Sequence, residues 1–310
     1  PLAGDPRFPT TKPRGGETTV GGIRDYLAQY WPVSAMVRGH DNFSEHIGQM
    51  DDVVLTWGVA ASEAMDACLI RDVPYILMVR WWRNVAPLPP DDLMKRDLDQ
   101  SFIEDHKKLF TSAGAVITNN LYAVEVLKRW YGIEAMVSYV AIFGAPKPGG
   151  DPKGPIIFVT DNKGVRGPET IRGIARLIPE REFVVINAFE EYSEPNISAT
   201  PYQRDMDSIY RQASILINPI YDHDGCGTGR VMMEAMRYGV PVVGTDRAGL
   251  METGGVSVLR NATPEDWAAT ILKILSDYTG FQTEARDSFA RHNAKAELDV
   301  YVNQINRLMK

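Results

Sequence analysis

The sequence predicts an α/β protein with two doubly wound parallel sheets, and two observations carry this prediction. Short apolar runs alternate with amphipathic stretches before residue 144, and the same alternation restarts after residue 155. Strands that alternate with helices form parallel sheets. The stretch between the two alternations, residues 144–155, is dense in glycine and proline, as linkers are. We therefore expect two Rossmann-like domains, residues 1–147 and 148–310, that face each other across a ligand-binding cleft.

In the first domain, a glycine-rich loop at residues 15–22 leads into an amphipathic helix at residues 23–31, without an evident strand before it. Further along, short apolar runs predict strands, and apolar residues at a helical spacing predict helices. The expected strands are residues 33–37, 51–57, 74–79, 115–118 and 135–142, and the expected helices are residues 58–71, 97–112 and 121–131.

The second domain repeats the same alternation after the linker. The expected strands are residues 156–160, 183–187, 215–217, 240–243 and 256–259, and the expected helices are residues 168–177, 205–212, 230–238 and 264–277. A long helical tail at residues 281–310 is expected to end the chain, either within the second domain or packed back on the first.

The composition indicates a soluble globular protein in a reducing compartment. Of 310 residues, 44% are hydrophobic and 24% are charged, and the formal net charge of −7 argues against a broad surface for nucleic acid. The two cysteines, Cys68 and Cys226, are too far apart in sequence to suggest a disulfide framework, which fits a cytoplasmic location. No signal peptide and no apolar run of membrane-spanning length is visible. The chain starts at Pro1 without an initiator Met, so a missing upstream piece is left open.

Residues 213–252 contain the strongest functional signal. An apolar run ends at Asn218-Pro219, a loop with glycines at 225, 227 and 229 follows, and a helix from Arg230 leads to a second apolar run. Such a unit places its loop at the carboxyl edge of a parallel sheet, where α/β proteins bind ligands. Glycines allow a ligand to approach the backbone, and the first N–H groups of the helix suit a phosphate or sugar hydroxyls.

Glu234 lies one turn into this helix and places a carboxylate beside the same loop. A carboxylate can accept two hydroxyl hydrogen bonds, which suits the diol of a ribose. The alternative is that Glu234 is an ordinary solvated helix residue.

The same unit resembles a known family. Glu234-Ala235-Met236, then Gly239-Val240-Pro241-Val242-Val243, Gly249 and Glu252, are similar to the pattern of the retaining GT-B glycosyltransferases of family GT4. Three further short motifs match the family pattern in their order and spacing along the chain. They are Lys163-Gly164 after the first strand of the second domain, Gly15-Gly16 at an N-terminal glycine loop, and Pro264-Glu265 at the start of a helix. The resemblance implies the GT-B fold and transfer of a sugar from a nucleoside diphosphate.

At matching positions the resemblance also implies residue roles. Glu234 would hold the ribose of the donor, and Lys163 would pair with its diphosphate. The donor sugar and phosphates would lie along the backbone of Gly227, Thr228, Gly229 and Arg230. Gly15 and Gly16 would close over the donor phosphate from the other domain.

The sequence departs from the family pattern at three places. Cys226 stands where the family keeps the first Glu of its E-x7-E motif, and a thiol cannot replace a carboxylate, so Asp222 or Asp224 would have to substitute. The family's Arg before the Lys-Gly pair is absent, and Arg230 or Arg166 would supply that charge. Arg80 stands where many relatives have a His.

Several residues keep two interpretations. Arg80 either contributes to the active site or stacks on the aromatic rings of Trp81 and Trp82 in a structural role. Glu252 accepts a hydrogen bond either from a backbone amide of its loop or from a sugar hydroxyl. His223 has no spaced ligand cluster around it, so we predict no metal site. No His is evident to activate Cys226, which argues against a thiol nucleophile.

Together these observations predict a retaining glycosyltransferase. The donor would be a UDP- or GDP-linked sugar, bound without a metal or other cofactor, and the catalytic residues would be Lys163, Arg230 and Glu234. The acceptor would be a saccharide, a lipid-linked glycan, a small molecule or, as the least favoured class, a modified nucleic acid. The alternatives are an inactive nucleotide-sugar binding protein and an epimerase or phosphorylase of the same fold.

Overall fold

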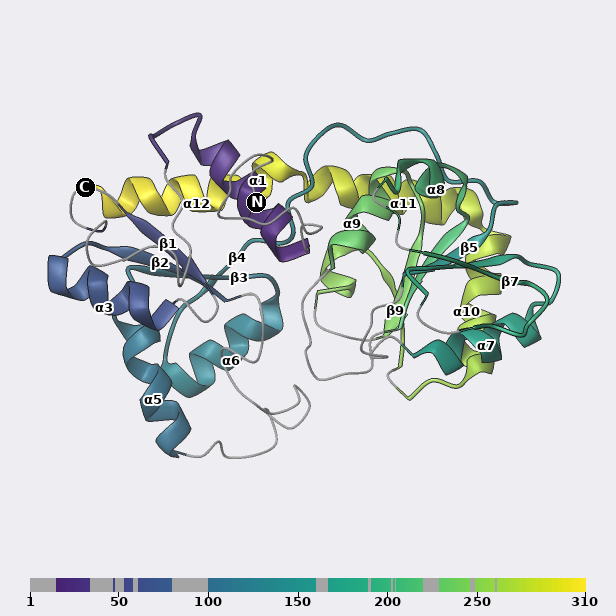
Figure 1. The fold of residues 1–310 in the computed structure, drawn as a ribbon, viewed down its shortest axis with the longest axis horizontal. Helices are drawn as coiled ribbons and strands as arrows, with labels where there is room; N and C mark the ends of the chain where they lie inside the picture. Colours follow the sequence, from purple (N-terminus) through teal and green to yellow (C-terminus); the bar gives the residue numbers. More distant parts are fainter. Residues whose placement is uncertain are drawn as a thin grey trace. The chain divides into compact units, whose positions relative to one another are not determined.

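The computed structural model forms two compact units (Figure 1). The first unit comprises residues 1–143 and 294–310, and the second comprises residues 144–293. The division therefore falls after Phe143 rather than after residue 147, and the last helix belongs to the first unit. The structure describes residues 15–33, 47, 53–57, 61–79, 100–159, 167–188, 191–201, 203, 205–219, 229–245, 249–259 and 261–310.

The first unit contains a parallel sheet in which the described strands follow one another in chain order, β1-β2-β3-β4. Its strands are β1 (Val54–Trp57), β2 (Tyr75–Val79), β3 (Ala115–Thr118) and β4 (Met136–Val137). Its helices are α1 (Gly15–Leu27), α3 (Ala61–Arg71), α5 (Gln100–Thr111), α6 (Leu121–Tyr131) and α12 (Ala294–Leu308).

Helices cover both faces of this first sheet (Figure 1). Side chains alternate between the faces along a strand, so Tyr75 and Leu77 pack against α3, α5 and α6, whereas Ile76 and Met78 pack against α1 and α12. Because β2 is buried on both faces, its sequence is a continuous apolar run rather than an alternating one.

The second unit contains a six-stranded parallel sheet in the order β10-β9-β8-β5-β6-β7. Its strands are β5 (Ile156–Val159), β6 (Phe183–Ile186), β7 (Ile197–Thr200), β8 (Ile215–Asn218), β9 (Val242–Thr245) and β10 (Val256–Val258). Its helices are α7 (Pro168–Leu177), α8 (Asp207–Gln212), α9 (Arg230–Arg237), α10 (Pro264–Ser276), α11 (Tyr278–Arg291) and the short 3₁₀ helix η3 (Met251–Thr253). In Figure 1, α7 and α10 cover one face of this sheet, and α9 and α11 cover the other.

The predicted fold class, an α/β protein with two parallel sheets, is confirmed. Three strands differ from their predicted bounds by two residues or more: β1 begins at Val54 rather than at residue 51, β9 begins at Val242 rather than at residue 240, and β4 is limited to two residues of the predicted 135–142. Strand β7 was not predicted at all. The predicted strand at residues 33–37 lies almost wholly outside the described residues.

The predicted glycine loop at residues 15–22 is wrong, because these residues form the first two turns of α1. Packing gives the reason for a glycine inside this helix. A Cβ atom added at Gly22 would lie 2.5 Å from Cε2 of Phe143, so glycine lets the helix approach the ring closely.

The predicted helical tail at residues 281–310 is two helices that separate at His292 and Asn293. Helix α11 packs on α9 in the second unit. Helix α12 buries Leu298 and Tyr301 in the core of the first unit. The Glu297 carboxylate also accepts a hydrogen bond from the Tyr139 amide at 2.6 Å, which anchors α12 beside the first sheet.

Candidate functional site

The strand order of the second sheet reverses between β5 and β8. Strand β5 has β8 on one side and β6 on the other, and all of these pairs are parallel. Phe158 and Ile217 are opposite one another in the β5–β8 pair, so both strands end at the same edge of the sheet. In open α/β sheets, ligands bind outside the carboxyl ends of the strands at such a switch point.

The two segments that leave these neighbouring strands carry most of the predicted site. Residues 160–166, which include Lys163 and Arg166, follow β5, and residues 220–228 follow β8. The second segment includes Asp222, Asp224, Cys226, Gly227 and Thr228. All of these residues, and also Arg80, lie outside the described residues, so their predicted roles stay predictions.

The helices that follow these segments, α7 and α9, both start with a glycine. Gly167 and Gly229 stand at their N-cap positions, and no described side chain caps their first amides. Among the other described helices, side chains of Asn120, Thr263 and Asp277 cap α6, α10 and α11, whereas α8 also has no side-chain cap. Free N–H groups and the helix dipole at an uncapped N-terminus favour an anion. The described structure at this switch point therefore suits phosphate.

Glu234 lies in the second turn of α9, where two groups hold its carboxylate. The Nε atom of Arg230 is 2.7 Å from Oε1 of Glu234, and the Tyr210 hydroxyl donates a hydrogen bond of 3.3 Å to Oε2. The side chain of Glu234 is 23% exposed and that of Arg230 is 30% exposed. Glu234 is therefore not a solvated surface residue but a fixed carboxylate that solvent still reaches.

The environment of Glu234 acts on its ionisation in two directions. Burial raises the pKa of the Glu234 carboxyl above its ordinary value, and this effect outweighs the opposing effects of Arg230 and Tyr210. Asp207 adds a further small rise through charge repulsion. A carboxyl group whose pKa is raised at a sheet edge is a typical feature of a functional site.

Helix α9 is anchored to the sheet beneath it by buried side chains. Met232, Met233 and Met236 are buried on its inner face. The amide Nδ2 of Asn218, the last residue of β8, donates to Sδ of Met232 at 3.1 Å. The position of α9 is therefore tied to the carboxyl end of β8.

The remaining predicted residues lie apart from Glu234 in the chain. Glu252 lies in η3, after β9, and its side chain is partly exposed. Gly15 and Gly16 form the start of α1 in the first unit. The structure thus brings together Arg230 and Glu234 with Gly229, and adds Tyr210, which the sequence did not single out. Its only sequence signal is a tyrosine in the short helix that precedes β8.

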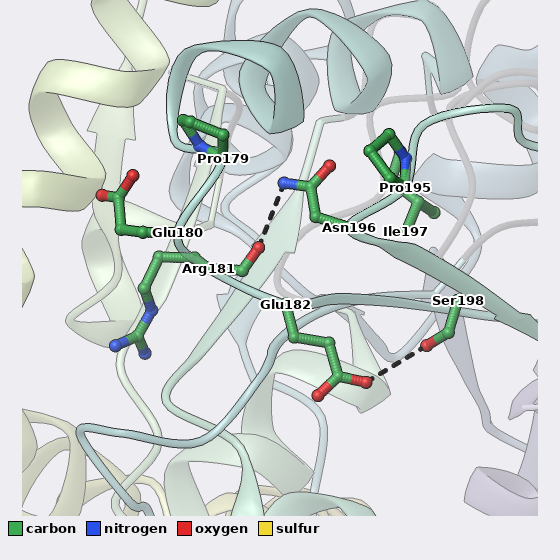
Figure 2. A pocket seen from close by; sticks show the side chains of 8 residues that line it. All are labelled: Pro179, Glu180, Arg181, Glu182, Pro195, Asn196, Ile197 and Ser198. Atoms are coloured by element: carbon green, nitrogen blue, oxygen red, sulfur yellow. Dashed lines mark hydrogen bonds between the residues drawn. The ribbon is translucent and has the colours of Figure 1, made fainter.

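A shallow hollow of about 290 Å³ lies at the opposite edge of the second sheet (Figure 2). It is formed where the chain enters β6 and β7, and its residues are Pro179–Glu182 and Pro195–Ser198. Figure 2 shows Asn196 directed at the carbonyl of Arg181, and this amide also donates to the carbonyls of Ala175 and Ile178. Asn196 thus ties the end of α7 to the strand entry, a structural role away from the switch point.

Among the described residues, no group of three or more His, Cys, Asp or Glu side chains is arranged to hold a metal ion. None of the helices in the described part of the chain has the length and apolar character that a membrane crossing requires.

Comparison with known proteins supports the interpretation of this edge. Residues 179–277, which include β8, α9 and β9, match the sequence model of the family described as Glycosyl transferases group 1. No protein among those with curated functions matches the sequence.

Solved structures resemble the chain over nearly its whole length. HepE from Anabaena, in complex with UDP and glucose, has a TM-score of 0.70 at 16% identity, over 96% of this chain and 97% of HepE. A glycosyltransferase from Rickettsia africae has a TM-score of 0.71 at 13% identity, over 97% of each chain. Sucrose-phosphate synthase from Thermosynechococcus elongatus has a TM-score of 0.62 at 16% identity, over 90% of this chain and 81% of its own. The predicted resemblance to GT-B glycosyltransferases is therefore confirmed: the chain has the GT-B fold, and residues 179–277 carry the sequence pattern of group 1 glycosyl transferases, while membership of family GT4 stays a prediction.

Proposed function

We propose that this protein is a glycosyltransferase that moves a sugar from a nucleoside-diphosphate sugar to an acceptor hydroxyl and retains the anomeric configuration. The observation that carries the proposal is the arrangement at the amino end of α9. The helix start at Gly229, which no described side chain caps, lies close in the chain to a held carboxylate, Glu234, at the switch point of a parallel sheet. Phosphate and ribose are the two ligand groups that this pair of features suits.

The nucleotide would bind with its phosphates at the first amides of α9 and its ribose hydroxyls on Glu234. Arg230 uses its Nε atom on Glu234, and a guanidinium has five N–H donors in all. Its remaining donors would serve the phosphates, together with Lys163 from the segment after β5. This arrangement needs no metal, because cationic side chains and the helix start would carry the phosphate charge.

In the reaction, the bond between the sugar C1 atom and the diphosphate oxygen breaks while a bond from C1 to the acceptor oxygen forms on the same face. The acceptor proton passes to the leaving diphosphate. Negative charge grows on the leaving group as the old bond breaks, and groups already aimed at that position lower the barrier. Lys163, Arg230 and the α9 amides are the groups proposed for this role.

UDP is the first nucleotide to test. HepE, whose fold resembles this one over nearly its full length, was crystallised with UDP and glucose. A panel of UDP, GDP, ADP and TDP, with their sugars, should raise the melting temperature of this protein for one base only, because a ligand stabilises the state that it binds. If every nucleoside diphosphate leaves the melting temperature unchanged at millimolar concentration, the proposal fails.

One observation favours a second candidate, an inactive protein that binds a nucleotide-sugar. Cys226 stands where the resembled family has the first Glu of its motif, and that carboxylate is expected to hold the donor sugar. Calorimetry combined with product analysis separates the two candidates. Binding of a nucleotide-sugar without transfer to any saccharide, lipid-linked or small-molecule acceptor, and without release of the diphosphate, favours the binding protein.

Lys163→Ala should lower kcat on the order of 100-fold, because removal of one group that stabilises transition-state charge has this size of effect. The matched control is Lys153→Ala, an exposed lysine before β5 at the other end of that strand, which should leave kcat unchanged. Initial rates of diphosphate release measure both variants. Equal rates for Lys163→Ala and the wild type would remove Lys163 from the mechanism.

A further inference from the structure

Tyr210 contacts Glu234 although 24 residues separate them in the chain. Its ring is 1% exposed, and its hydroxyl donates to Oε2 of Glu234, while Arg230 binds the other carboxylate oxygen. Among the described residues, Tyr210 and Arg230 thus each hold one oxygen of Glu234. A carboxylate has about four lone-pair sites, so acceptor positions remain on both oxygens for a ligand.

The Tyr210 hydroxyl is fixed by the packing around its ring. The ring lies 5.9 Å from the ring of Tyr238, centroid to centroid, at an interplanar angle of 32°. Asp207, at the start of the same helix α8, forms an ion pair with Lys147, and the Lys147 ammonium lies 5.3 Å from the Tyr238 ring centroid. Because the Tyr210 ring is buried and packs on a ring that is itself in contact with Lys147, the hydroxyl is ordered before a ligand binds.

We propose that Tyr210 is a positioning residue that orients the Glu234 carboxylate for the two hydroxyls of a nucleotide ribose. The inference rests on the proposed function and deepens it, since it assigns the recognition of the sugar ring of the nucleotide to a pair of residues from α8 and α9. Arg230 alone holds one oxygen and leaves the carboxylate free to rotate about that contact. The Tyr210 hydroxyl removes this freedom, so the ribose meets a carboxylate that is already oriented.

The test compares ribose and dideoxyribose ligands on the full-length protein. UDP and GDP, each in its ribose form and its 2′,3′-dideoxy form, are titrated by calorimetry into the wild type and Tyr210→Phe. The substitution keeps the ring and removes only the hydroxyl. The variant keeps the ribose contacts to Glu234 and loses only the bond that orients the carboxylate, so it should weaken binding of the ribose form about 3- to 10-fold, the size of one net hydrogen bond. Binding of the dideoxy form should change less than about twofold, because it lacks the hydroxyls that Glu234 would hold.

Tyr278→Phe is the matched control. Tyr278 is a buried tyrosine of the same unit whose hydroxyl lies beside Gly150, at the start of α11. This variant should bind both forms of the nucleotide as the wild type does. Melting curves of both variants establish that each is folded before the titrations are compared.

The pH dependence of binding gives a second readout that a purely structural tyrosine would not change. Tyr210 lowers the pKa of Glu234 by stabilising its charged form. Tyr210→Phe should therefore move the acid limb of nucleotide binding to higher pH, whereas Tyr278→Phe should leave it in place.

The outcomes separate this inference from the proposed function. Equal weakening of ribose and dideoxy ligands in Tyr210→Phe, or no weakening of either, overturns the positioning role while nucleotide binding stands. A wild type that binds the ribose and dideoxy forms equally overturns the assignment of the ribose to Glu234. A wild type that binds neither UDP nor GDP overturns the proposed function, and the inference with it.

Discussion

Helices α6 and α9 both begin at the end of a parallel strand, but the protein treats their first amides differently. Asn120 at the start of α6 is 1% exposed, and its Oδ1 atom accepts a 2.7 Å hydrogen bond from the Ala123 amide. Gly229 at the start of α9 has φ −72° and ψ 153°, an extended conformation that any residue can adopt. Glycine is thus not required there by the backbone. The protein closes the start of α6 with its own side chain, whereas no described side chain closes the start of α9, where we propose that phosphate binds.

The two sheets differ in strand order, alongside the difference between the starts of α6 and α9. The described strands of the first sheet follow chain order, without a reversal. The second sheet reverses between β5 and β8, and α7 and α9, both with glycine N-caps, follow those two strands. The reversal in strand order and two glycine N-caps thus coincide at the edge where open α/β sheets bind ligands.

The largest effect is expected from Gly229→Asp, which would give α9 the kind of cap that α6 has. A Cβ atom at this position would lie 3.6 Å from Cε of Met232, an ordinary contact, so the side chain fits. Stability should be unchanged or should rise by a few tenths of a kcal/mol. Nucleotide affinity should fall at least about 100-fold, because like charges in a binding site cost several kcal/mol.

Gly229→Asn separates charge from capping in this experiment. Its amide oxygen caps the helix as well as a carboxylate does, but it brings no negative charge. It should weaken the nucleotide less than Gly229→Asp does. Calorimetry with UDP measures both variants, and equal affinities for Gly229→Asp and the wild type would show that no phosphate lies at this helix start.

The next effect concerns the half-buried Glu234 and the buried Glu194 of the second unit, whose pKa values shift in opposite directions. Burial raises the pKa of Glu234. Burial also acts to raise the pKa of Glu194, but its own backbone amide, Arg176 and Arg172 outweigh this and lower it. Glu234→Gln should weaken UDP binding roughly 10- to 100-fold at neutral pH, the range for loss of hydrogen bonds to a charged group.

The sign of the pH dependence follows from these shifts. In the wild type, UDP affinity should fall as the pH drops through the raised pKa of Glu234, and Glu234→Gln should abolish that fall.

The stability of the fold should depend on pH in opposite ways through the two glutamates. The stability that Glu234 contributes is present below its unfolded-state pKa and is lost as pH rises through the folded-state pKa. The contribution of Glu194 is present above its unfolded-state pKa and is lost as pH falls through its lowered pKa. Urea titrations of Glu234→Gln and Glu194→Gln across acid pH test these opposite slopes, and slopes of the same sign would contradict them.

The smallest effect is expected from Asn120→Ala in the first unit. It removes the cap of α6 and should lower the free energy of unfolding by about 1 kcal/mol. UDP affinity should not change, because this helix start serves the fold alone. Urea denaturation and calorimetry on one sample provide both values, and a loss of affinity with unchanged stability would reverse the roles assigned to α6 and α9.

The sequence allowed most of the fold to be predicted, because buried parallel strands such as Tyr75–Val79 are continuous apolar runs. Strand β7 was missed, because Ile197–Thr200 pairs on one side only, with β6, and has two exposed residues, so it lacks that signal. The break between α11 and α12 was missed for another reason. Both helices carry apolar faces, and nothing local shows that Phe289 is buried with the second unit and Leu298 with the first.

The candidate site was predicted only as far as local patterns extend. Glu234 and Arg230 lie four residues apart on one helix, so their proximity follows from helical spacing. Tyr210 lies on a different helix, and its contact with Glu234 depends on how α8 and α9 pack on the same sheet. The predicted loop at Gly15 and Gly16 failed because glycine inside a helix can serve close packing, as Gly22 does against Phe143.

The measurement that tests the central claim most directly is a crystal structure of the protein with the nucleoside diphosphate that stabilises it most. We expect the diphosphate within hydrogen-bond distance of the first amides of α9 and the ribose hydroxyls on the Glu234 carboxylate. A nucleotide seated elsewhere, for example in the hollow at Pro179–Glu182, with the start of α9 empty, would contradict the account.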